Sequence, residues 1–440
     1  MSNLRLLIAF LILVSLLIAT WVVADIRLDQ PASTNRIAYV DEDGVIRTVR
    51  WDGSGAVIIS PDVEGFFTWP TWSPDSGRLV YSGVTGSGEN IRMSLFASGS
   101  NGRDATEIFA GEDGVTGLLA QGVIHYPLWS PDGDKVAFIA ATADGLTLFM
   151  DDLSADPSAQ ALLDNGPLWI SWAPDSEHLL AHRADEHFLI NSDEDLNVDP
   201  LGLTDVETRV PAWSPDGTSF VTGLRANRTQ YHILGSGVSG GEAAAPRRLL
   251  TTSPIPAYLW SPDGNYISIA HSSRPLAYLG LSLDVYASLS VYSDTDADPL
   301  LIVREPMLAH FWSPNGRQIA YARLSEKSGV LRWVVLDIAS GERKALVDFV
   351  PSVAQLTMFQ FFDQYAYSHS LWSPDSDALV FAGNLNTDAV TASFKGLNSG
   401  ASLGGNSLEH DGEHIMVVNT SGDTTTRVIA DGFMATWSPN

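Results

Sequence analysis

The sequence predicts an all-β protein, an eight-bladed β-propeller preceded by one N-terminal transmembrane helix. Three observations support this prediction: a repeated tryptophan motif, several short apolar strands in each repeat, and chain ends that complement each other. The motif W-S-P-D, or a close variant, occurs eight times at intervals of 41 to 65 residues. Four-stranded propeller blades repeat every ~40–50 residues, so the longer intervals indicate insertions. The motif tryptophans are Trp72, Trp129, Trp172, Trp213, Trp260, Trp312, Trp372 and Trp437.

Each copy of the motif predicts the end of one strand followed by a tight turn. The tryptophan offers a large apolar surface that packs between neighbouring sheets. Proline fixes φ and aspartate bonds to nearby backbone groups, and both properties favour a turn. An alternating apolar strand follows, for example Lys135–Phe138 or Gln318–Tyr321. Further short strands complete each period, so one period corresponds to one blade.

The two ends of the sequence supply complementary parts of one blade. Trp437–Asn440 contains a motif with no strand after it, and Arg36–Val40 resembles the strand that should follow. Val45–Trp51 and Ala56–Ile59 supply two more strands. We therefore predict a composite blade that closes the ring and leaves no open sheet edge. The predicted domains are a signal-anchor helix (1–25), a linker (26–35) and the propeller (36–440).

The N-terminal segment Leu6–Ala24 is a run of uncharged residues long enough to span a bilayer. A helix of this length measures ~28 Å, close to the ~30 Å thickness of the hydrocarbon core. Arg5 before it and Asp25 after it orient the N-terminus to the cytoplasm. The alternative is a signal peptide cleaved after Val22–Ala24, but the length of the run and Trp21 favour an anchor. We expect a single-pass membrane protein with the propeller outside the cytoplasm, in the periplasm or at the cell surface.

Charge and cysteine content exclude several functions. The net charge of -27 disfavours nucleic acid, because a strongly acidic surface repels phosphate backbones. The chain has no cysteine, which excludes disulfides, thiolate catalysis and thiolate metal sites. We expect a monomeric propeller without a cofactor.

The W-S-P-D-G repeat, followed by a strand of the I-A-Y type, resembles the TolB-like β-propeller family. It also resembles the propeller domains of prolyl oligopeptidase and dipeptidyl peptidase relatives. The resemblance covers residues 36–440 and implies the fold more than an activity, because propellers serve many roles. Gly237–Gly241 matches the G-x-S-x-G pattern of hydrolases, but a glycine- and alanine-rich link surrounds it instead of a strand and a helix. We therefore expect no peptidase domain, no catalytic role for Ser239 and no enzymatic activity.

Three histidines precede motif tryptophans and raise the alternative of a metal site. His125, His310 and His369 lie 4, 2 and 3 residues before their tryptophans, where the innermost strands surround the channel. Some propeller lyases that act on pectin fragments share similar repeats and use histidines to bind a metal. The unequal spacing favours packed histidines here, because geometry rather than residue count decides such sites. We predict no metal ligand.

Aromatic side chains and two long insertions predict a binding face. Trp69, Tyr126, Trp169 and His369 each stand three positions before a motif tryptophan, which is compatible with inter-blade packing or with an aromatic channel mouth. The insertions Pro351–Tyr367 and Gly383–Glu413 are expected on the face opposite the W-S-P-D turns. The predicted binding residues are Trp69, Tyr126, Trp169, His369, Phe361, Phe362 and Tyr365.

These features predict a membrane-anchored extracytoplasmic propeller that binds a protein, peptide or glycan through its loop-rich face. One alternative is a structural subunit of an envelope or transporter assembly. The other is a metal-dependent propeller lyase or hydrolase. If Phe361, Phe362 and Tyr365 are buried, the first insertion belongs to the core instead of the binding face.

Overall fold

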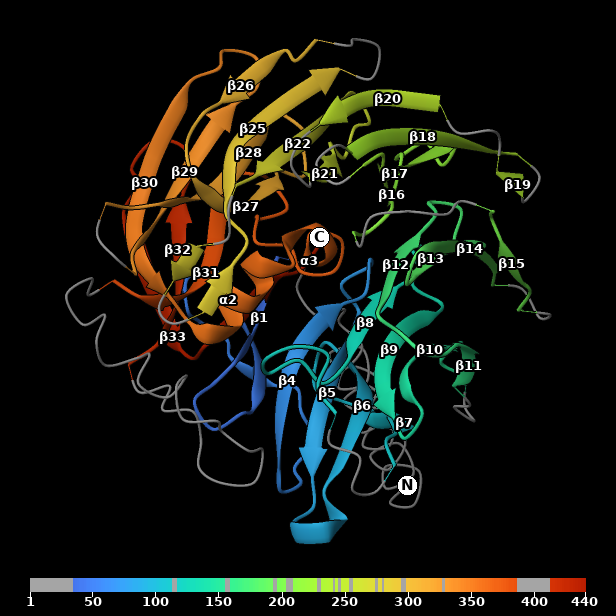
Figure 1. The fold of residues 1–440 in the computed structure, drawn as a ribbon. Helices are drawn as coiled ribbons and strands as arrows, with labels where there is room; N and C mark the ends of the chain where they lie inside the picture. Colours follow the sequence, from blue (N-terminus) through green and yellow to red (C-terminus); the bar gives the residue numbers. More distant parts are fainter. Residues whose placement is uncertain are drawn as a thin grey trace, which may run out of the picture. The chain divides into compact units, whose positions relative to one another are not determined.

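The computed structural model describes residues 35–440, apart from 113–116, 155–158, 193–195, 203–208, 228–230, 240–241, 244–246, 253–255, 274–275, 279–280, 294–297, 327–328 and 386–411 (Figure 1). Contacts divide the chain into two units, Met1–Thr34 and Asn35–Asn440, and the β-sheets belong to the second unit. The predicted anchor and nearly all of the predicted linker lie outside the described residues. Within the described residues, no helix is both long and apolar enough to cross a membrane.

Three sheets consist of four antiparallel strands in chain order, each starting with the strand that ends at a motif tryptophan. The first contains β4 (Gly65–Trp72), β5 (Arg78–Thr85), β6 (Arg92–Gly99) and β7 (Thr106–Ala110), with a 3₁₀ turn η1 (Gly88–Asn90) between β5 and β6. The second contains β8 (Tyr126–Trp129), β9 (Val136–Thr142), β10 (Gly145–Asp151) and β11 (Gln160–Leu163). The third contains β12 (Leu168–Trp172), β13 (His178–Arg183), β14 (Glu186–Asn191) and β15 (Val198–Pro200).

The next sheets follow the same plan with small additions. One contains β16 (Ala212–Trp213), β17 (Ser219–Arg225), β18 (Tyr231–Ser239), β19 (Glu242–Ala243) and β20 (Arg247–Thr252). The following group contains β21 (Pro256–Trp260), β22 (Tyr266–Ser272), β25 (Tyr286–Ser293) and β26 (Leu301–Val303), and the hairpin of β23 (Leu276–Tyr278) and β24 (Leu281–Leu283) lies between β22 and β25 in the chain. Next come β27 (Met307–Trp312), β28 (Gln318–Leu324), β29 (Leu331–Asp337) and β30 (Arg343–Pro351).

Within the described residues, the next group contains only three strands, β31 (Ala378–Asn384), β32 (His414–Asn419) and β33 (Thr426–Asp431). The segment around Trp372 takes the place of its inner strand. Trp372 forms a bridge with Leu379, and the amide of Val380 donates to the carbonyl of Leu371 over 2.8 Å. Short contacts connect the β21, β27 and β31 groups into one continuous sheet, for example the pairing of Tyr286 with Met307.

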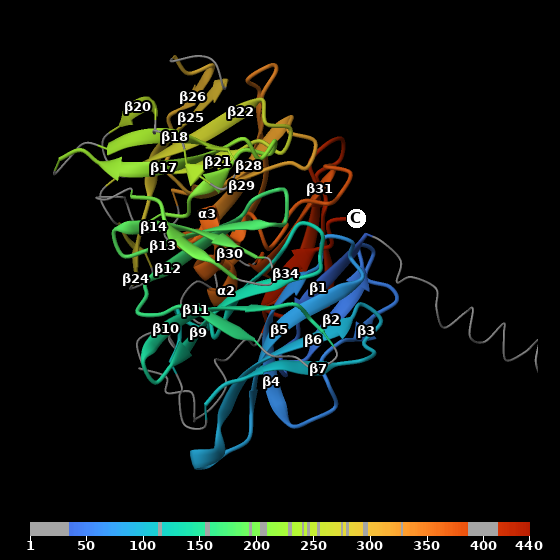
Figure 2. The same cartoon turned by 90° about the vertical axis from the view of Figure 1, so that its right-hand side faces the viewer.

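The predicted composite sheet is present, in the order β3 (Val57–Ile58), β2 (Ile46–Arg50), β1 (Arg36–Val40) and β34 (Met434–Trp437). In its register, Ile37 pairs with Trp437 and Val40 pairs with Met434. The indole of Trp437 also donates to Asn35 Oδ1 over 2.7 Å. Figure 2 shows β34 beside β1, so strands from the two ends of this unit complete one sheet.

The motif turns have the predicted chemistry. Ser73 Oγ donates to Asp75 over 2.6 Å and accepts from the amide of Arg78 over 2.9 Å, and the serines of most other turns do the same. The indoles of Trp129 and Trp172 donate over 3.1 Å to backbone carbonyls of the preceding sheet. The motif therefore closes its own turn and also connects neighbouring sheets.

Two short helices lie in the middle of the ring of sheets, and the sequence did not predict them (Figure 1). They are α2 (Val353–Gln360) and α3 (Phe362–Tyr365), within the expected loop Pro351–Tyr367. Ser352 begins α2 because its hydroxyl accepts from the amide of Gln355 over 3.0 Å. Leu356, Met358 and Phe359 of α2 are buried in the main hydrophobic core. We call residues 353–369 the plug.

Candidate functional site

The structure brings four of the seven predicted binding residues together, but as core contacts of the plug. The ring of Tyr365 stacks on Trp69 at 4.8 Å between centroids and meets Tyr126 edge-on at 5.6 Å. The hydroxyl of Tyr126 donates to the carbonyl of Gln364 over 2.9 Å, and His369 lies 5.7 Å from the ring of Trp69. Trp69, Tyr126, Tyr365 and His369 are at most 3% exposed. This inter-blade packing was the other interpretation of the aromatic positions.

The remaining predicted residues are also packed. Phe362 is fully buried, with its ring 4.8 Å from His310 and 5.5 Å from Tyr286. Trp169 is half-buried against His182, and Phe361 is half-buried against the core. An open aromatic mouth at this end of the channel is therefore a wrong expectation, because the plug buries its own apolar side chains there. Most of Gly383–Glu413 lies outside the described residues.

A buried ion pair holds the plug in place. The carboxylate of Asp363 in α3 is 5% exposed and lies 3.6 Å from the guanidinium of Arg209, which is also 3.4 Å from Asp284. Burial raises the pKa of Asp363, and the charge of Arg209 opposes that rise. Breaking such a buried pair leaves an uncompensated charge, which is strongly destabilising. Nothing in the sequence connects Arg209 with Asp363.

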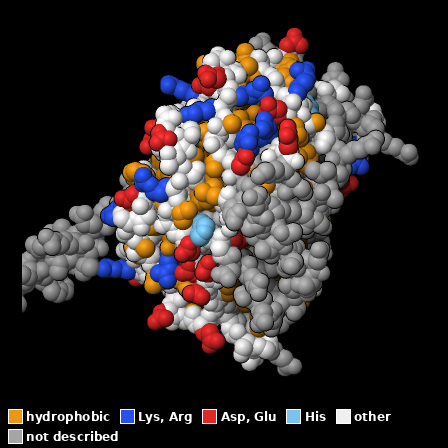
Figure 3. Space-filling view, turned by 90° about the vertical axis from the view of Figure 1, so that its left-hand side faces the viewer, with side chains coloured by type: hydrophobic (Ala, Val, Ile, Leu, Met, Phe, Trp, Pro, Cys, Tyr) orange, Lys and Arg blue, Asp and Glu red, His pale blue; other side chains and the backbone are white. Residues whose placement is uncertain are grey.

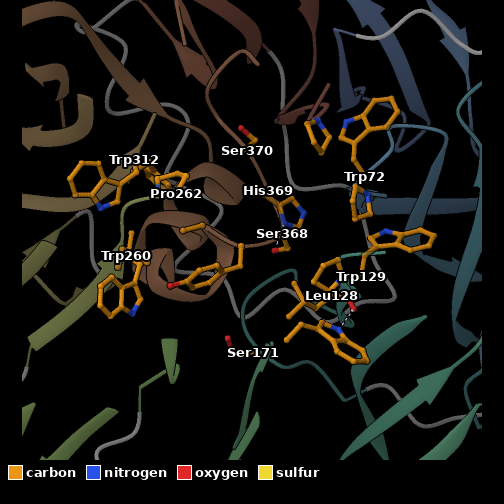
Figure 4. A pocket seen from close by; sticks show the side chains of 18 of the residues that line it. Trp72, Leu128, Trp129, Ser171, Trp260, Pro262, Trp312, Ser368, His369 and Ser370 are labelled. Atoms are coloured by element: carbon orange, nitrogen blue, oxygen red, sulfur yellow. Dashed lines mark hydrogen bonds between the residues drawn. The ribbon is translucent and has the colours of Figure 1, made fainter. Parts of the chain in front are cut away.

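The channel contains a cavity of about 520 Å³ among the motif turns (Figure 4). All eight motif tryptophans line it, together with six prolines of the turns. Plug residues also line it, and Figure 4 shows Ser368 and His369 near its centre, with Trp72, Trp129, Trp260 and Trp312 around them. The lining prolines are Pro74, Pro131, Pro174, Pro215, Pro262 and Pro439.

The lining of this cavity is apolar and uncharged. No Asp, Glu, Lys or Arg is among the described residues that line it. Its polar groups include the hydroxyls of Thr71, Ser171, Ser261 and Tyr367. Tyr367 is 39% exposed. Apolar walls with a few polar groups are typical of ligand sites. The repeat was the signal for this site, because residues at the ends of all inner strands meet around the axis.

The three candidate metal histidines are packed separately instead of sharing a site. His125 Nδ1 lies 3.1 Å from Ser82 Oγ, His310 Nε2 lies 2.7 Å from Ser268 Oγ, and His369 Nδ1 lies 2.8 Å from Ser368 Oγ. Burial lowers the pKa of each imidazole to about 3, so each is neutral. Among the described residues, the group with ligand atoms close enough to hold a metal is Asp175, Glu177 and His178, of which the two carboxylates are exposed.

These buried histidines predict that acid destabilises the protein. Unfolded histidine has a pKa of ~6.5, so below that pH the unfolded chain binds protons that the folded chain does not. The stability contributed by neutral His125, His310 and His369 is present above that pH and is lost as pH falls towards 3. Between about pH 7 and about pH 5.5 we expect the free energy of unfolding in urea to fall by roughly 1 kcal/mol per histidine. His310→Gln should make this slope shallower, and an unchanged slope would contradict the assignment.

No protein-family model matches the sequence, and no curated protein sequence matches it. Solved structures are similar at low identity. A crystal structure described as the eukaryotic initiation factor has a TM-score of 0.54 at 10% identity and covers 93% of this chain and 99% of its own. The dihydro-heme d1 dehydrogenase NirN in complex with DHE has a TM-score of 0.54 at 12% identity, and the match covers 90% of this chain and 74% of the NirN chain.

TolB from Acinetobacter baumannii is also similar, with a TM-score of 0.37 at 14% identity and coverage of 72% of this chain and 84% of its own. Similar structures thus include propeller-type folds, TolB among them. At these identities the likenesses concern the arrangement of strands and not a shared activity. The repeated four-stranded antiparallel sheets of the described residues are consistent with a β-propeller fold.

Proposed function

We propose that this protein is an extracytoplasmic binding protein: a closed eight-bladed propeller, held at a membrane by Leu6–Ala24, that takes a protein, peptide or glycan partner at the mouth of the central cavity. The observation that carries the proposal is the uncharged cavity of about 520 Å³, which the plug closes at one end and the motif turns surround at the other. The proposed site therefore lies at the motif turns, opposite the face on which the sequence predicts the insertions.

The eight-bladed ring is supported by the cavity itself. Seven of the eight motif tryptophans end an inner strand, Trp372 forms a bridge with Leu379 instead, and all eight line the same cavity. Hydrogen bonds between neighbours support the same order: Trp72 Nε1 donates to the carbonyl of Thr436 in the composite sheet, and the amide of Trp437 donates to the carbonyl of Ser370 over 2.7 Å. The composite sheet thus lies between the β31 group and the β4 sheet.

Binding rather than catalysis is supported by the chemistry of the lining. Ser368 and His369 form a serine–histidine contact at 2.8 Å, which resembles part of a hydrolase site. Burial lowers the pKa of His369 to about 3, so its imidazole is a poor base at neutral pH. His369 Nε2 also faces Thr71 Oγ1 at 3.5 Å inside the core. This contact stabilises the floor of the cavity.

A photo-crosslinking residue tests the proposed site in the full-length chain in its native membranes. We expect a crosslinked partner, protein or glycan, from position 262, where the exposed Pro262 lines the cavity. Position 63 is the matched control, because Val63 is 55% exposed in the link between β3 and β4, away from the motif turns. Crosslinks from position 63 alone would overturn the proposed site. Crosslinks from Ile302, 43% exposed on β26, would favour a structural subunit.

A further inference from the structure

We propose that the mouth of the cavity binds a basic segment of a partner protein, with an apolar side chain in the cavity and lysine or arginine side chains against the aspartates of the motif turns. This inference rests on the proposed function and specifies the chemistry of the partner. It starts from the charges that surround an uncharged cavity.

The motif turns form an acidic belt. We define the turn belt as residues 73–78, 130–135, 173–178, 214–219, 261–266, 313–318, 373–378 and 438–440. It holds nine aspartates and glutamates but only three lysines and arginines. The motif aspartates are exposed, and each directly follows a motif proline. They are Asp75, Asp132, Asp175, Asp216, Asp263 and Asp375.

Hydrogen bonds join three pairs of neighbouring turns in the turn belt. The amide of Asp132 donates to Ser176 Oγ over 2.9 Å, and the amide of Asn315 donates to Ser376 Oγ over 3.2 Å. The amide of Asn440 donates to Ser76 Oγ over 3.1 Å, which joins the last turn to the first. Because the proline before most of these aspartates lines the cavity, the carboxylates surround its opening.

Hydrogen bonds from the turn serines favour the charged form of Asp75 and Asp216. The hydroxyl of Ser73 donates to Asp75, and that of Ser214 donates to Asp216 over 2.5 Å. These hydrogen bonds lower the pKa of both aspartates, which stay ionised in mild acid. On the side of the ring that Figure 3 shows, basic and acidic side chains are interspersed. Arg332 of β29 pairs with Asp348 of β30.

The cavity and the turn belt together select the partner. Pockets of ~300–1,000 Å³ accommodate compact apolar groups, and this lining offers indole and proline faces without a charge. Complementary charges at a rim accelerate association and reject partners of the wrong sign. An acidic rim around an apolar centre therefore favours a leucine, proline or aromatic side chain flanked by basic residues. A neutral sugar would use the cavity alone, and an anionic partner would be repelled.

The chain itself supplies a conservative substitution for the test. In the W-S-P-N turn, Asn315 Oδ1 accepts from Ser313 Oγ over 2.8 Å and from the amide of Arg317 over 3.0 Å, as the aspartates do elsewhere. Asp→Asn substitutions should therefore keep the turns. The test variant combines Asp75→Asn, Asp132→Asn, Asp216→Asn and Asp263→Asn. Its control removes equal charge from exposed sites outside the turn belt, through Asp43→Asn, Asp62→Asn, Glu64→Gln and Asp144→Asn.

Binding of the full-length protein in detergent is measured against pools of short random peptides. Each of four pools has a fixed composition. The first combines basic with apolar residues, the second acidic with apolar, the third basic with polar, and the fourth neutral with apolar. Binding to an array of neutral glycans is measured in parallel. We expect selective binding of the basic and apolar pool that weakens with salt. The test variant should bind it about tenfold more weakly, and the control should bind as wild type.

The outcomes separate this inference from the proposed function. Equal binding of all pools, or undiminished binding by the test variant, would overturn the basic segment. If position 262 crosslinks a partner while no peptide pool is enriched, the site stands and the basic segment is wrong. Glycan binding that is insensitive to the aspartate substitutions would likewise contradict the basic segment and keep the site. If position 262 also captures nothing, both proposals fail.

Discussion

Deletion of Ala435–Asn440 is expected to prevent the folding of residues 35–440. The deletion removes most of β34, and with it the strand that pairs with β1 and the indole that donates to Asn35. Trp437 is 2% exposed, and loss of a buried tryptophan side chain alone costs about 3–5 kcal/mol. That is a large share of the ~5–15 kcal/mol by which a domain is stable. Circular dichroism and thermal melting of the purified chain measure the effect.

A shorter deletion is the control. Removing only Ser438–Asn440 keeps β34 but removes the hydrogen bond from the amide of Arg36 to Ser438 Oγ at 2.9 Å and the contact of Asn440 with Ser76. We expect this variant to fold with a lower melting temperature. If the longer deletion melted like the wild type, the sheet of β1 to β3 would not depend on β34, and the ring would close elsewhere.

Phe362→Ala is expected to destabilise the protein by about 3–5 kcal/mol, because it empties a fully buried position in the centre of the channel. Phe362 contacts the rings of Tyr286, His310 and Phe311, so the cavity left behind would have few ways to collapse. Tyr365→Ala should have a similar effect through loss of its stack on Trp69. Urea denaturation monitored by tryptophan fluorescence measures both changes.

Phe361→Ala is the matched control for the plug. Phe361 is the neighbouring residue and only half-buried, so its loss should cost clearly less than that of Phe362. If instead Phe362→Ala kept the stability of the wild type but lost partner capture, the plug would be a binding loop and not core. The pair of variants therefore distinguishes the two roles of the insertion.

The sheets were well predicted from the sequence because the residues that form each turn and its flanking strands lie close together in the chain and recur in every repeat. Each motif carries its own turn, as the contacts of Ser73 with Asp75 and Arg78 show, and every copy confirms the others. The composite sheet was predictable for the same reason, since a motif at Trp437 lacked the strand that Arg36–Val40 supplies. Repetition therefore fixed the position of elements that lie about 400 residues apart in the chain.

The plug was not predictable because it has neither repetition nor periodicity. Helix α2 has apolar residues around most of its circumference, so no amphipathic pattern marks it. The position of the plug depends on long-range contacts such as the ion pair of Asp363 in α3 with Arg209. Trp69, Tyr126 and Trp169 lie on the inner strands β4, β8 and β12, yet their exposure depended on whether something filled the channel. Because the plug fills the channel at the end where the sequence predicted the binding face, the candidate site lies at the turn belt instead.

The pairing of β34 with β1 also determines when during synthesis the composite sheet can be completed. A ribosome makes β1, β2 and β3 first and their missing partner last, so the edge of β1 has no partner during almost all of synthesis. The intervening sheets pair strands close in sequence and can assemble as they emerge. An exposed edge is a template for association with other chains. Interrupted synthesis therefore yields a chain prone to aggregation instead of a smaller working ring, and the cell must either shield that edge or destroy unfinished copies.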